Sequence, residues 1–142
     1  MTGHSDNGLL RCVVVVDDAL PIGLAANATG MLALTLGARV PDLPGAELVD
    51  ADGETHPGLI PQGLPVLRAP AERLAELRAR AAAHDQLGVI DFPADGQRST
   101  DYDEVRRRVA ATPGAELRYL GILIYGPRRA VGRLTGNLGL LR

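Results

Sequence analysis

Carboxylates follow two apolar runs of the sequence and are the first candidates for chemistry. Asp17 and Asp18 come directly after the run Val13–Val16, and Asp91 follows the apolar stretch "LGVI". Open α/β sheets bind ligands at the carboxyl ends of their strands, where these residues are expected. Successive strand residues point to opposite faces, so at most one of Asp17 and Asp18 faces a given cleft. Asp91 could orient an amide or a water, and the alternative for each aspartate is a turn or cap.

An amide and a histidine complete the candidate catalytic group. Asn27 lies among small residues in an expected helix, where its side chain could donate to a carbonyl or a developing oxyanion. The alternative is an asparagine that bonds to nearby backbone. His56 lies in a loop-rich region and could act as an acid or base near neutral pH, although exposed loop histidines are common. The sequence contains no metal or cofactor motif, so we expect neither group.

Anion binding is expected near the end of the chain. Gly126 and Pro127 open the last expected helix, whose backbone amides, with Arg128 and Arg129, could bind a phosphate or carboxylate. The same Gly-Pro pair is also ordinary punctuation before a helix. The run Arg106–Arg108, by itself a solvated face, could join these arginines in contacting an RNA backbone. One Phe, three Tyr and no Trp leave few stacking partners for such an RNA.

Composition excludes several other classes of protein. All 15 basic residues are arginine, so the chain can supply no Schiff base and no lysine base. The net charge of -2 argues against a generally basic nucleic-acid-binding protein. Cys12 is the single cysteine, and neither Ser5 nor Ser99 lies at a strand-to-helix turn, so covalent catalysis is not expected. The sequence has no membrane-length apolar run, and its polar start lacks a signal core, so we expect a cytoplasmic protein.

Apolar periodicity predicts one three-layer α/β domain over residues 10–142, after a flexible polar leader at residues 1–9. Near-continuous apolar runs predict buried strands at 9–16, 64–69, 87–93 and 117–126. Helices are expected at 22–36, at 70–84, after the capping-box spacing Thr100–Asp103, and at 127–136. A small hairpin with arms 47–50 and 55–60 interrupts this series. Alternating helices and apolar strands place helices on both faces of a sheet.

The two ends of the chain resemble type II peptidyl-tRNA hydrolases. That family closes on a Gly-Pro, a helix and a Thr-Gly-x-Leu-x-Leu ending, which appear here as Gly126-Pro127 and Thr135–Leu140. The first strand and helix of the family are similar to the segment with Asp18, Gly23 and Ala25–Asn27. The resemblance therefore spans the chain from end to end.

The same resemblance implies which residues border a shared cleft. The family's strand that ends in Asp and is soon followed by Gln is similar to Asp91 and Gln97. Asp18 is the aspartate of its pair that would face the site. Thr135 and Asn137, at the end of the chain, are expected to cap the last helix and to line the same cleft.

Residues Leu10–Arg142 also resemble a bacterial domain family of unknown function, the one numbered two thousand. The resemblance implies a four-stranded mixed sheet in the peptidyl-tRNA hydrolase arrangement, often assembled as a homodimer. Gly23 and Gly30 stand where the hydrolases have a lysine and a histidine, and arginine is a poor acid–base replacement. Ordinary peptidyl-tRNA hydrolysis is therefore not expected. The insertion Ala46–Gln62 could cover the cleft as a lid.

Two functional hypotheses follow. In the first, the protein is hydrolase-like and acts on an amide, an ester or a related small acyl substrate. Asp18 or Asp91 would then position water, Asn27 would bind the carbonyl, and His56 would serve as acid or base. In the alternative, the chain is a non-catalytic binding module for a small anionic or nucleotide-like ligand, or for RNA, held at Gly126–Arg129.

Overall fold

The valine-rich run forms an inner strand of a four-stranded sheet with the order β4-β1-β6-β5. The strands are β1 (Leu10–Asp17), β4 (Val66–Ala69), β5 (Gly88–Pro93) and β6 (Tyr119–Pro127). β1 pairs in parallel with β4 and antiparallel with β6, and β5 pairs antiparallel with β6. The structure is a computed structural model that describes residues 10–97 and 101–142. The predicted mixed sheet is therefore confirmed.

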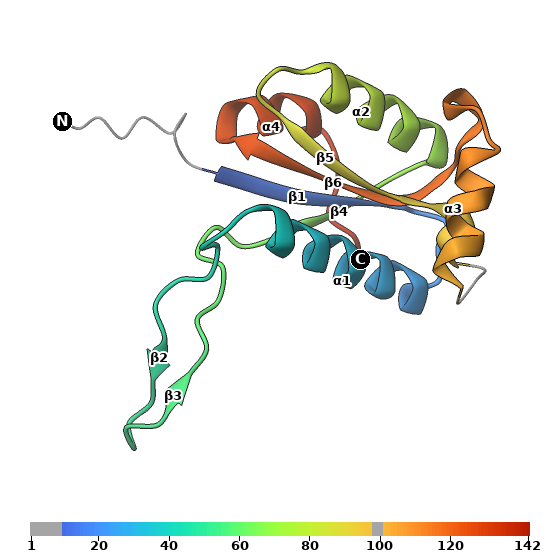
Figure 1. The fold of residues 1–142 in the computed structure, drawn as a ribbon. Helices are drawn as coiled ribbons and strands as arrows, with labels where there is room; N and C mark the ends of the chain where they lie inside the picture. Colours follow the sequence, from blue (N-terminus) through green and yellow to red (C-terminus); the bar gives the residue numbers. More distant parts are fainter. Residues whose placement is uncertain (1–9, 98–100) are drawn as a thin grey trace.

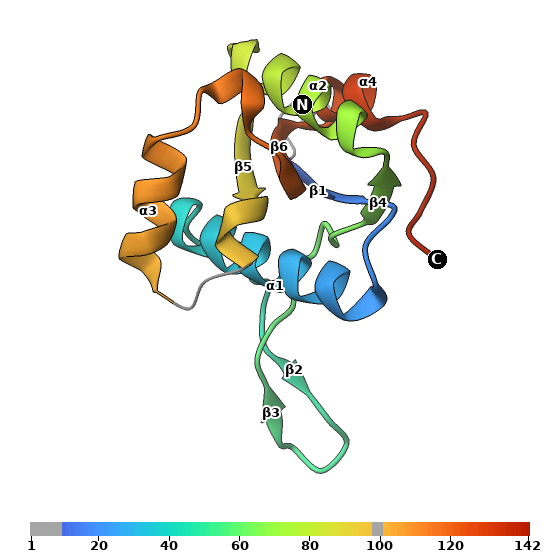
Figure 2. The same cartoon turned by 90° about the vertical axis from the view of Figure 1, so that its right-hand side faces the viewer.

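Helices cover both faces of this sheet, as Figures 1 and 2 show. The helices are α1 (Ile22–Arg39), α2 (Ala71–Ala83), α3 (Tyr102–Ala110) and α4 (Arg128–Thr135), with the short 3-10 turns η2 (Ala94–Gln97) and η3 (Gly114–Glu116). α1 lies on one face, α2 and α4 lie on the other, and α3 stands beside the β5 edge. None of the helices in the described ranges is long and apolar enough to span a membrane.

Strict alternation along β1 divides the core into two clusters, one on each face of the sheet. Val13 and Val15 pack with α2 and α4, whereas Cys12, Val14 and Val16 pack with α1. All five side chains are at most 2% exposed. Burial raises the pKa of the Cys12 thiol, and the nearby Arg11 charge only partly opposes this shift, so the thiol stays protonated as a small core hydrophobe. A strand buried on both faces explains the continuous apolar run.

Several boundaries differ from the expected ones. α1 continues to Arg39, three residues past the expected end at 36, because no proline interrupts it before Pro41. The predicted leader and Thr100 lie outside the described residues. Asp101 is the N-cap of α3 and its side chain accepts a hydrogen bond from the Asp103 amide at 3.0 Å.

The insertion between α1 and β4 forms a hairpin that projects from the body (Figures 1 and 2). Its strands β2 (Leu48–Val49) and β3 (Thr55–His56) have two residues each, so both arms are shorter than the expected 47–50 and 55–60. Pro57 follows β3 directly and has no amide proton to extend the ladder. The hairpin does not fold over the sheet edge of its own chain, where the lid was expected.

Gly126 joins β6 to α4 in a conformation that other residues rarely adopt. Its φ is 151°, and a Cβ there would come within 2.8 Å of the Gln86 carbonyl oxygen.

We expect Gly126→Ala to lower the free energy of unfolding by about 1–3 kcal/mol, since both backbone and loop must shift. The matched control is Gly132→Ala in α4, where a Cβ meets nothing within 4 Å. That control should be neutral or stabilising by up to about 1 kcal/mol. Urea denaturation of both variants tests this, and equal stabilities would contradict the packing of this junction.

Candidate functional site

The two aspartates at the end of β1 have separate surroundings. The Asp17 carboxylate accepts a hydrogen bond from the Ala19 amide at 2.9 Å and so caps the turn into α1. The backbone amide of Asp18 donates to the Ala69 carbonyl at 3.0 Å, and its side chain is exposed. Asp17 is therefore a turn aspartate, and Asp18 is the one that faces solvent at the strand end.

Asp91 and Asn27 lie on opposite faces of the sheet. The Asp91 carboxylate pairs with the Arg78 guanidinium of α2 at 3.1 Å, and that guanidinium carbon lies 5.8 Å from the centre of the Tyr119 ring. Its strand neighbour Ile90 points to the other face and packs in the cluster beneath α1. Asn27 is exposed on α1. The two side chains that were expected to share a cleft therefore do not meet within one chain.

The Arg78–Asp91–Tyr119 group is a packing arrangement on the α2 face. Tyr119 is 6% exposed, and burial is the main cause that raises the pKa of its hydroxyl. The Arg78 charge lowers that pKa and the Asp91 charge raises it, so the two partners act in opposite directions on the hydroxyl. Asp91 is thus an ion-pair partner of Arg78 and not the turn or cap residue of the alternative, and its expected role towards a substrate stays a prediction.

His56 lies on the projecting hairpin, where its Nε2 atom is 2.9 Å from the Asp50 carboxylate. Both side chains are largely exposed, at 49% and 38%. With Glu54 they form a group whose ligand atoms all lie within 4.8 Å of one another. Residues of these types can bind a metal ion, but all three are exposed, so we assign no metal site to this group. Figures 1 and 2 show the hairpin directed away from the four-stranded sheet.

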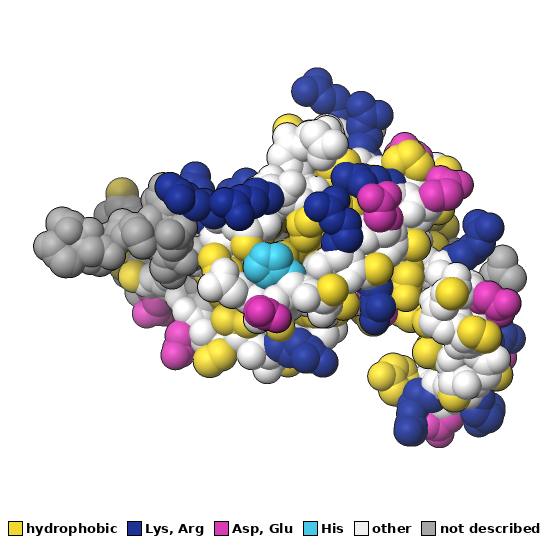
Figure 3. Space-filling model, turned by 90° about the horizontal axis from the view of Figure 1, so that it is seen from above, with side chains coloured by type: hydrophobic (Ala, Val, Ile, Leu, Met, Phe, Trp, Pro, Cys, Tyr) yellow, Lys and Arg dark blue, Asp and Glu magenta, His cyan; other side chains and the backbone are white. Residues whose placement is uncertain are grey.

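The remaining predicted ligand residues gather around α4. Gly126 is buried at the junction, Pro127 is the N-cap, and Arg128 and Arg129 are exposed. Figure 3, which looks onto this side of the molecule from above, shows arginine side chains spread over it. A hollow of about 250 Å³ lies here, lined by His84, Gln86, Pro127, Arg129, Ala130 and Arg133.

Thr135, near the end of the chain, is buried in α4 and does not line a cleft. Its buried hydroxyl donates to the Val131 carbonyl at 2.9 Å inside α4, whereas Asn137 is exposed. Gln97 ends η2, but its side chain lies outside the part of the structure that is described. The closing motif thus acts as a helix end in this fold.

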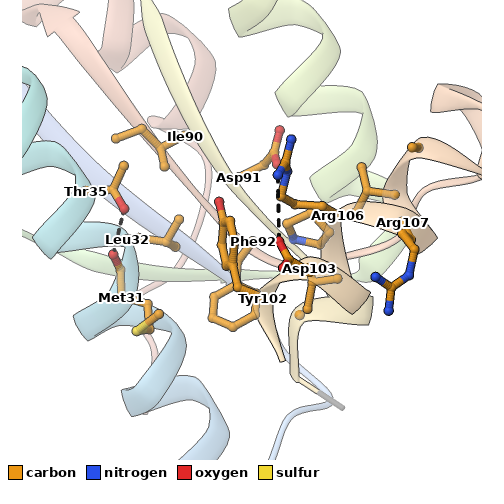
Figure 4. A pocket seen from close by; sticks show the side chains of 15 residues that line it. Met31, Leu32, Thr35, Ile90, Asp91, Phe92, Tyr102, Asp103, Arg106 and Arg107 are labelled. Carbon is orange, nitrogen blue, oxygen red and sulfur yellow. Dashed lines mark hydrogen bonds and ion pairs between the residues drawn. The ribbon is translucent and has the colours of Figure 1, made fainter. Parts of the chain in front are cut away.

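An open cavity lies between α1, the end of β5 and α3 (Figure 4). Its volume is about 1030 Å³. Figure 3 shows α3 separated from the rest of the body by a hollow on this side. Most of the lining is apolar. The lining residues are Met31, Leu32, Thr35, Ile90, Asp91, Phe92, Pro93, Gly96, Tyr102, Asp103, Val105, Arg106, Arg107, Val109 and Ala110.

The cavity exists because α3 is only loosely attached to the body. None of its residues is fully buried, and Val105 and Val109, one turn apart, face the cavity. Arg106 approaches Asp103 at 3.7 Å, and Arg108 binds Glu104 at 2.6 Å, so these contacts stabilise α3 itself.

This cavity was not expected from the sequence. Arg106–Arg108 were expected to be a solvated face or an RNA contact, and Phe92, Thr35 and Tyr102 were not among the expected functional residues. One available signal was the amphipathic spacing of Val105 and Val109, which predicts a helix with an apolar side. That spacing could not show that the apolar side faces an unfilled space.

The chain is thus an α/β domain with one mixed four-stranded sheet and a cavity between α1 and α3. The chain belongs to the family described as "protein of unknown function (DUF2000)", whose model matches residues 10–142. The predicted family is thereby confirmed.

One solved structure shares the fold over nearly its whole length. It is Atu0240, a protein of unknown function from Agrobacterium tumefaciens strain C58. The two chains are 18% identical, with a TM-score of 0.82, over 92% of this chain and 96% of that chain. A comparison with curated proteins finds no match.

A double-mutant cycle tests whether Arg78 and Asp91 act as a structural pair. We expect a coupling energy of about 0.5–1 kcal/mol in the stability of Arg78→Met, Asp91→Asn and the double variant, because the pair is only half-buried. The exposed Arg106–Asp103 pair at 3.7 Å is the matched control and should show coupling near zero. A zero coupling for Arg78 and Asp91 would show that their contact contributes nothing to the fold.

The Asp50 carboxyl gives the hairpin a defined pH response. The hydrogen bond from His56, and then those from backbone amides, hold the pKa of Asp50 below its usual range. Since the folded pKa is depressed, the stabilisation is complete above the ordinary value of about 3.9 and is lost as pH falls below it. The Glu54 amide donates to the Asp50 carboxylate, so its protection against hydrogen exchange should decrease as the pH falls below about 3.9.

A carboxyl NMR titration checks the cause of that response. His56→Ala should raise the pKa of Asp50 towards its usual range, and His84→Ala, on a histidine at the end of α2, should leave it unchanged. An unchanged titration in His56→Ala would contradict the assigned cause.

Proposed function

We propose that this protein is a non-catalytic binding module whose cavity between α1 and α3 takes a small, mostly apolar molecule with an anionic group. The observation that carries the proposal is the cavity itself, about 1030 Å³ in volume and lined mainly by apolar side chains. Ligand pockets typically measure roughly 300–1,000 Å³ and combine an apolar lining with a few polar groups.

The polar groups at the cavity fit an anionic end of the ligand. Arg106 lies at the cavity (Figure 4), and its contact with Asp103 is long, at 3.7 Å, and exposed. A guanidinium of this kind can hold a carboxylate or phosphate with charge-assisted hydrogen bonds. Leu32 and Phe92 supply apolar surface for the rest of the molecule. An apolar ligand with one charged end therefore matches both parts of the lining.

The hydrolase hypothesis stays a prediction. Its four residues, Asp18, Asn27, Asp91 and His56, lie at a strand end, on α1, on the α2 face and on the hairpin, so one chain alone does not assemble them. The relation of this fold to type II peptidyl-tRNA hydrolases is likewise a proposal. It is supported by the mixed sheet and by the Gly126–Pro127 junction between β6 and α4. The expected cytoplasmic location and homodimer are also untested.

Ligand binding is tested with decanoate and decanol as probes, measured by displacement of a fluorescent anilinonaphthalene sulfonate. Thr35→Trp should fill the cavity and abolish binding of both probes, because Thr35 is an exposed helical residue on the cavity wall. Arg106→Ala should weaken the binding of decanoate by at least about tenfold and leave the binding of decanol unchanged, since a charge-assisted hydrogen bond is worth about 1.5–3 kcal/mol.

Two variants away from the cavity are the matched controls for this experiment. Ala82→Trp on α2 and Arg133→Ala on α4 should bind both probes as the wild type does. The proposal fails if Thr35→Trp binds decanoate as tightly as Ala82→Trp does. It also fails if the wild-type chain binds neither probe.

A further inference from the structure

The small hollow between the end of α2 and the start of α4 differs in character from the cavity beside α3. Its volume is about 250 Å³, and the two lining sets have no residue in common. Two of its six lining residues are apolar, and the polar or charged ones are His84, Gln86, Arg129 and Arg133. None of the six is acidic, so the lining attracts an anion.

The two sides of this hollow are held together by the junction between β6 and α4. A Cβ at Gly126 would come within 2.8 Å of both the Gln86 carbonyl oxygen and the Leu87 side chain, so the segment after α2 packs directly on this junction. Within that segment the Leu87 amide donates to the His84 carbonyl at 3.3 Å. The side chains from α4 and from the end of α2 therefore keep a fixed relation, and the hollow is formed before any ligand enters.

His84 supplies a hydrogen-bond donor to the hollow. Its Nδ1 atom is 3.1 Å from the backbone nitrogen of Gln86, and an amide N–H can only donate. We therefore assign the ring proton to Nε2, which has no hydrogen-bond partner among residues 10–97 and 101–142. An imidazole held in this way presents an N–H to its surroundings and can donate to an anionic oxygen.

The two arginines of the hollow lie where helices disfavour them. Arg129 is in the first turn of α4, where the helix dipole opposes a cation, and no acidic residue accompanies it there. Arg129 and Arg133 are four residues apart, so two like charges share one side of the helix. Neither makes an ion pair with any other described residue. The chain thus leaves two neighbouring positive charges uncompensated, and such local conflicts are expected at functional sites.

Further positive charge surrounds the hollow. Arg11 is paired with Gly126 in the sheet, and the alternation along β1 puts Arg11 on the same face as Val13, the face that carries α2 and α4. Figure 3, which looks onto this face, shows arginine side chains spread over it. Asp85 is the one acidic residue between α2 and β5, and it does not line the hollow. The surrounding charge therefore raises the local concentration of anions.

The size of the hollow and its donors favour a phosphate group. Pockets for whole organic ligands typically measure roughly 300–1,000 Å³, so this hollow suits a compact group. A carboxylate has two oxygens in one plane, whereas a phosphate monoester presents three terminal oxygens to donors that come from different directions. Two guanidinium groups on α4 and one imidazole on the other side match that arrangement. No Phe, Tyr or Trp lines the hollow, so it offers no stacking surface for an RNA base.

We propose that this hollow binds the phosphate group of a small phosphate monoester. Arg129 and Arg133 pair with the phosphate oxygens, and His84 donates to one of them from Nε2. This site differs from the one expected at Gly126–Arg129, because Arg128 does not line the hollow, whereas Arg133 and His84 do. The proposal does not rest on the proposed function, since the two sites are lined by different residues and are measured with different probes.

Isothermal titration calorimetry of the full chain, with glycerol 3-phosphate as the probe and constant ionic strength, measures this binding. The wild type should bind one molecule with a dissociation constant below about 1 mM. Arg129→Gln and Arg133→Gln should each raise that constant by at least about tenfold, because each removes a charge-assisted hydrogen bond. His84→Ala should raise it by about threefold, since it removes one weaker donor.

A neighbouring arginine provides the matched control. Arg128→Gln makes the same change of charge one residue away, in an exposed side chain outside the hollow, and should alter the dissociation constant by less than about threefold. Glycerol should not bind. Dimethyl phosphate, a diester with a single negative charge, should bind at least about tenfold more weakly than glycerol 3-phosphate.

Thermal unfolding distinguishes a binding role of Arg129 from a structural one. In phosphate-free buffer Arg129→Gln should be at least as stable as the wild type, because it removes an uncompensated charge. Glycerol 3-phosphate at about ten times its dissociation constant should raise the Tm of the wild type by a few degrees. The same concentration should raise the Tm of Arg129→Gln by less.

Three outcomes would overturn the proposal. One is a wild-type chain that does not bind glycerol 3-phosphate at about 10 mM. Another is an Arg128→Gln variant that loses as much affinity as Arg129→Gln and Arg133→Gln do, which would indicate a diffuse charge effect. The third is a single-stranded RNA without terminal phosphates that binds more tightly than glycerol 3-phosphate and competes with it, which would assign this surface to a nucleic-acid backbone.

Discussion

The structure depends on one strand that is buried on both faces and paired on both edges. β1 holds β4 in parallel on one side and β6 antiparallel on the other, and its side chains alternate between two hydrophobic clusters. Any polar residue in the middle of this strand would lie unpaired in one cluster or the other, which is costly. Valine satisfies both requirements because it is apolar and β-branched. The helices on the two faces are held through this strand and its neighbour β6.

The same alternation separates the residues that were expected to do chemistry. Asp91 and Ile90 are adjacent in sequence, yet one binds Arg78 on the α2 face and the other packs beneath α1. The Asp91 carboxylate is thus turned towards α2 and away from Asn27, although Asp91 is among the residues that line the cavity beside α3. The proposed binding function therefore depends on the cavity beside α3 and not on these polar groups.

Loosely held parts of the fold gather around α1. α3 buries none of its side chains, the hairpin is wholly exposed, and the outward side of α1 has no charge. A single chain of this size can bury about two thirds of its surface, so these parts are not explained by a shortage of core. The cavity lies between two of these parts, because its lining includes Met31 of α1 together with Arg106 and Arg107 of α3.

The sequence alone determined the strands, the helices and the order in which they alternate, since each depends on local periodicity, proline and glycine. The run Val13–Val16 predicts a doubly buried strand, and Pro70 and Pro127 mark the starts of α2 and α4. Only the tertiary structure decided which face Asp91 points to, where the hairpin with His56 goes, and that α3 leaves a cavity. These outcomes depend on contacts between segments far apart in the chain. Local patterns record that a side chain is apolar or charged, but they do not record what stands opposite it.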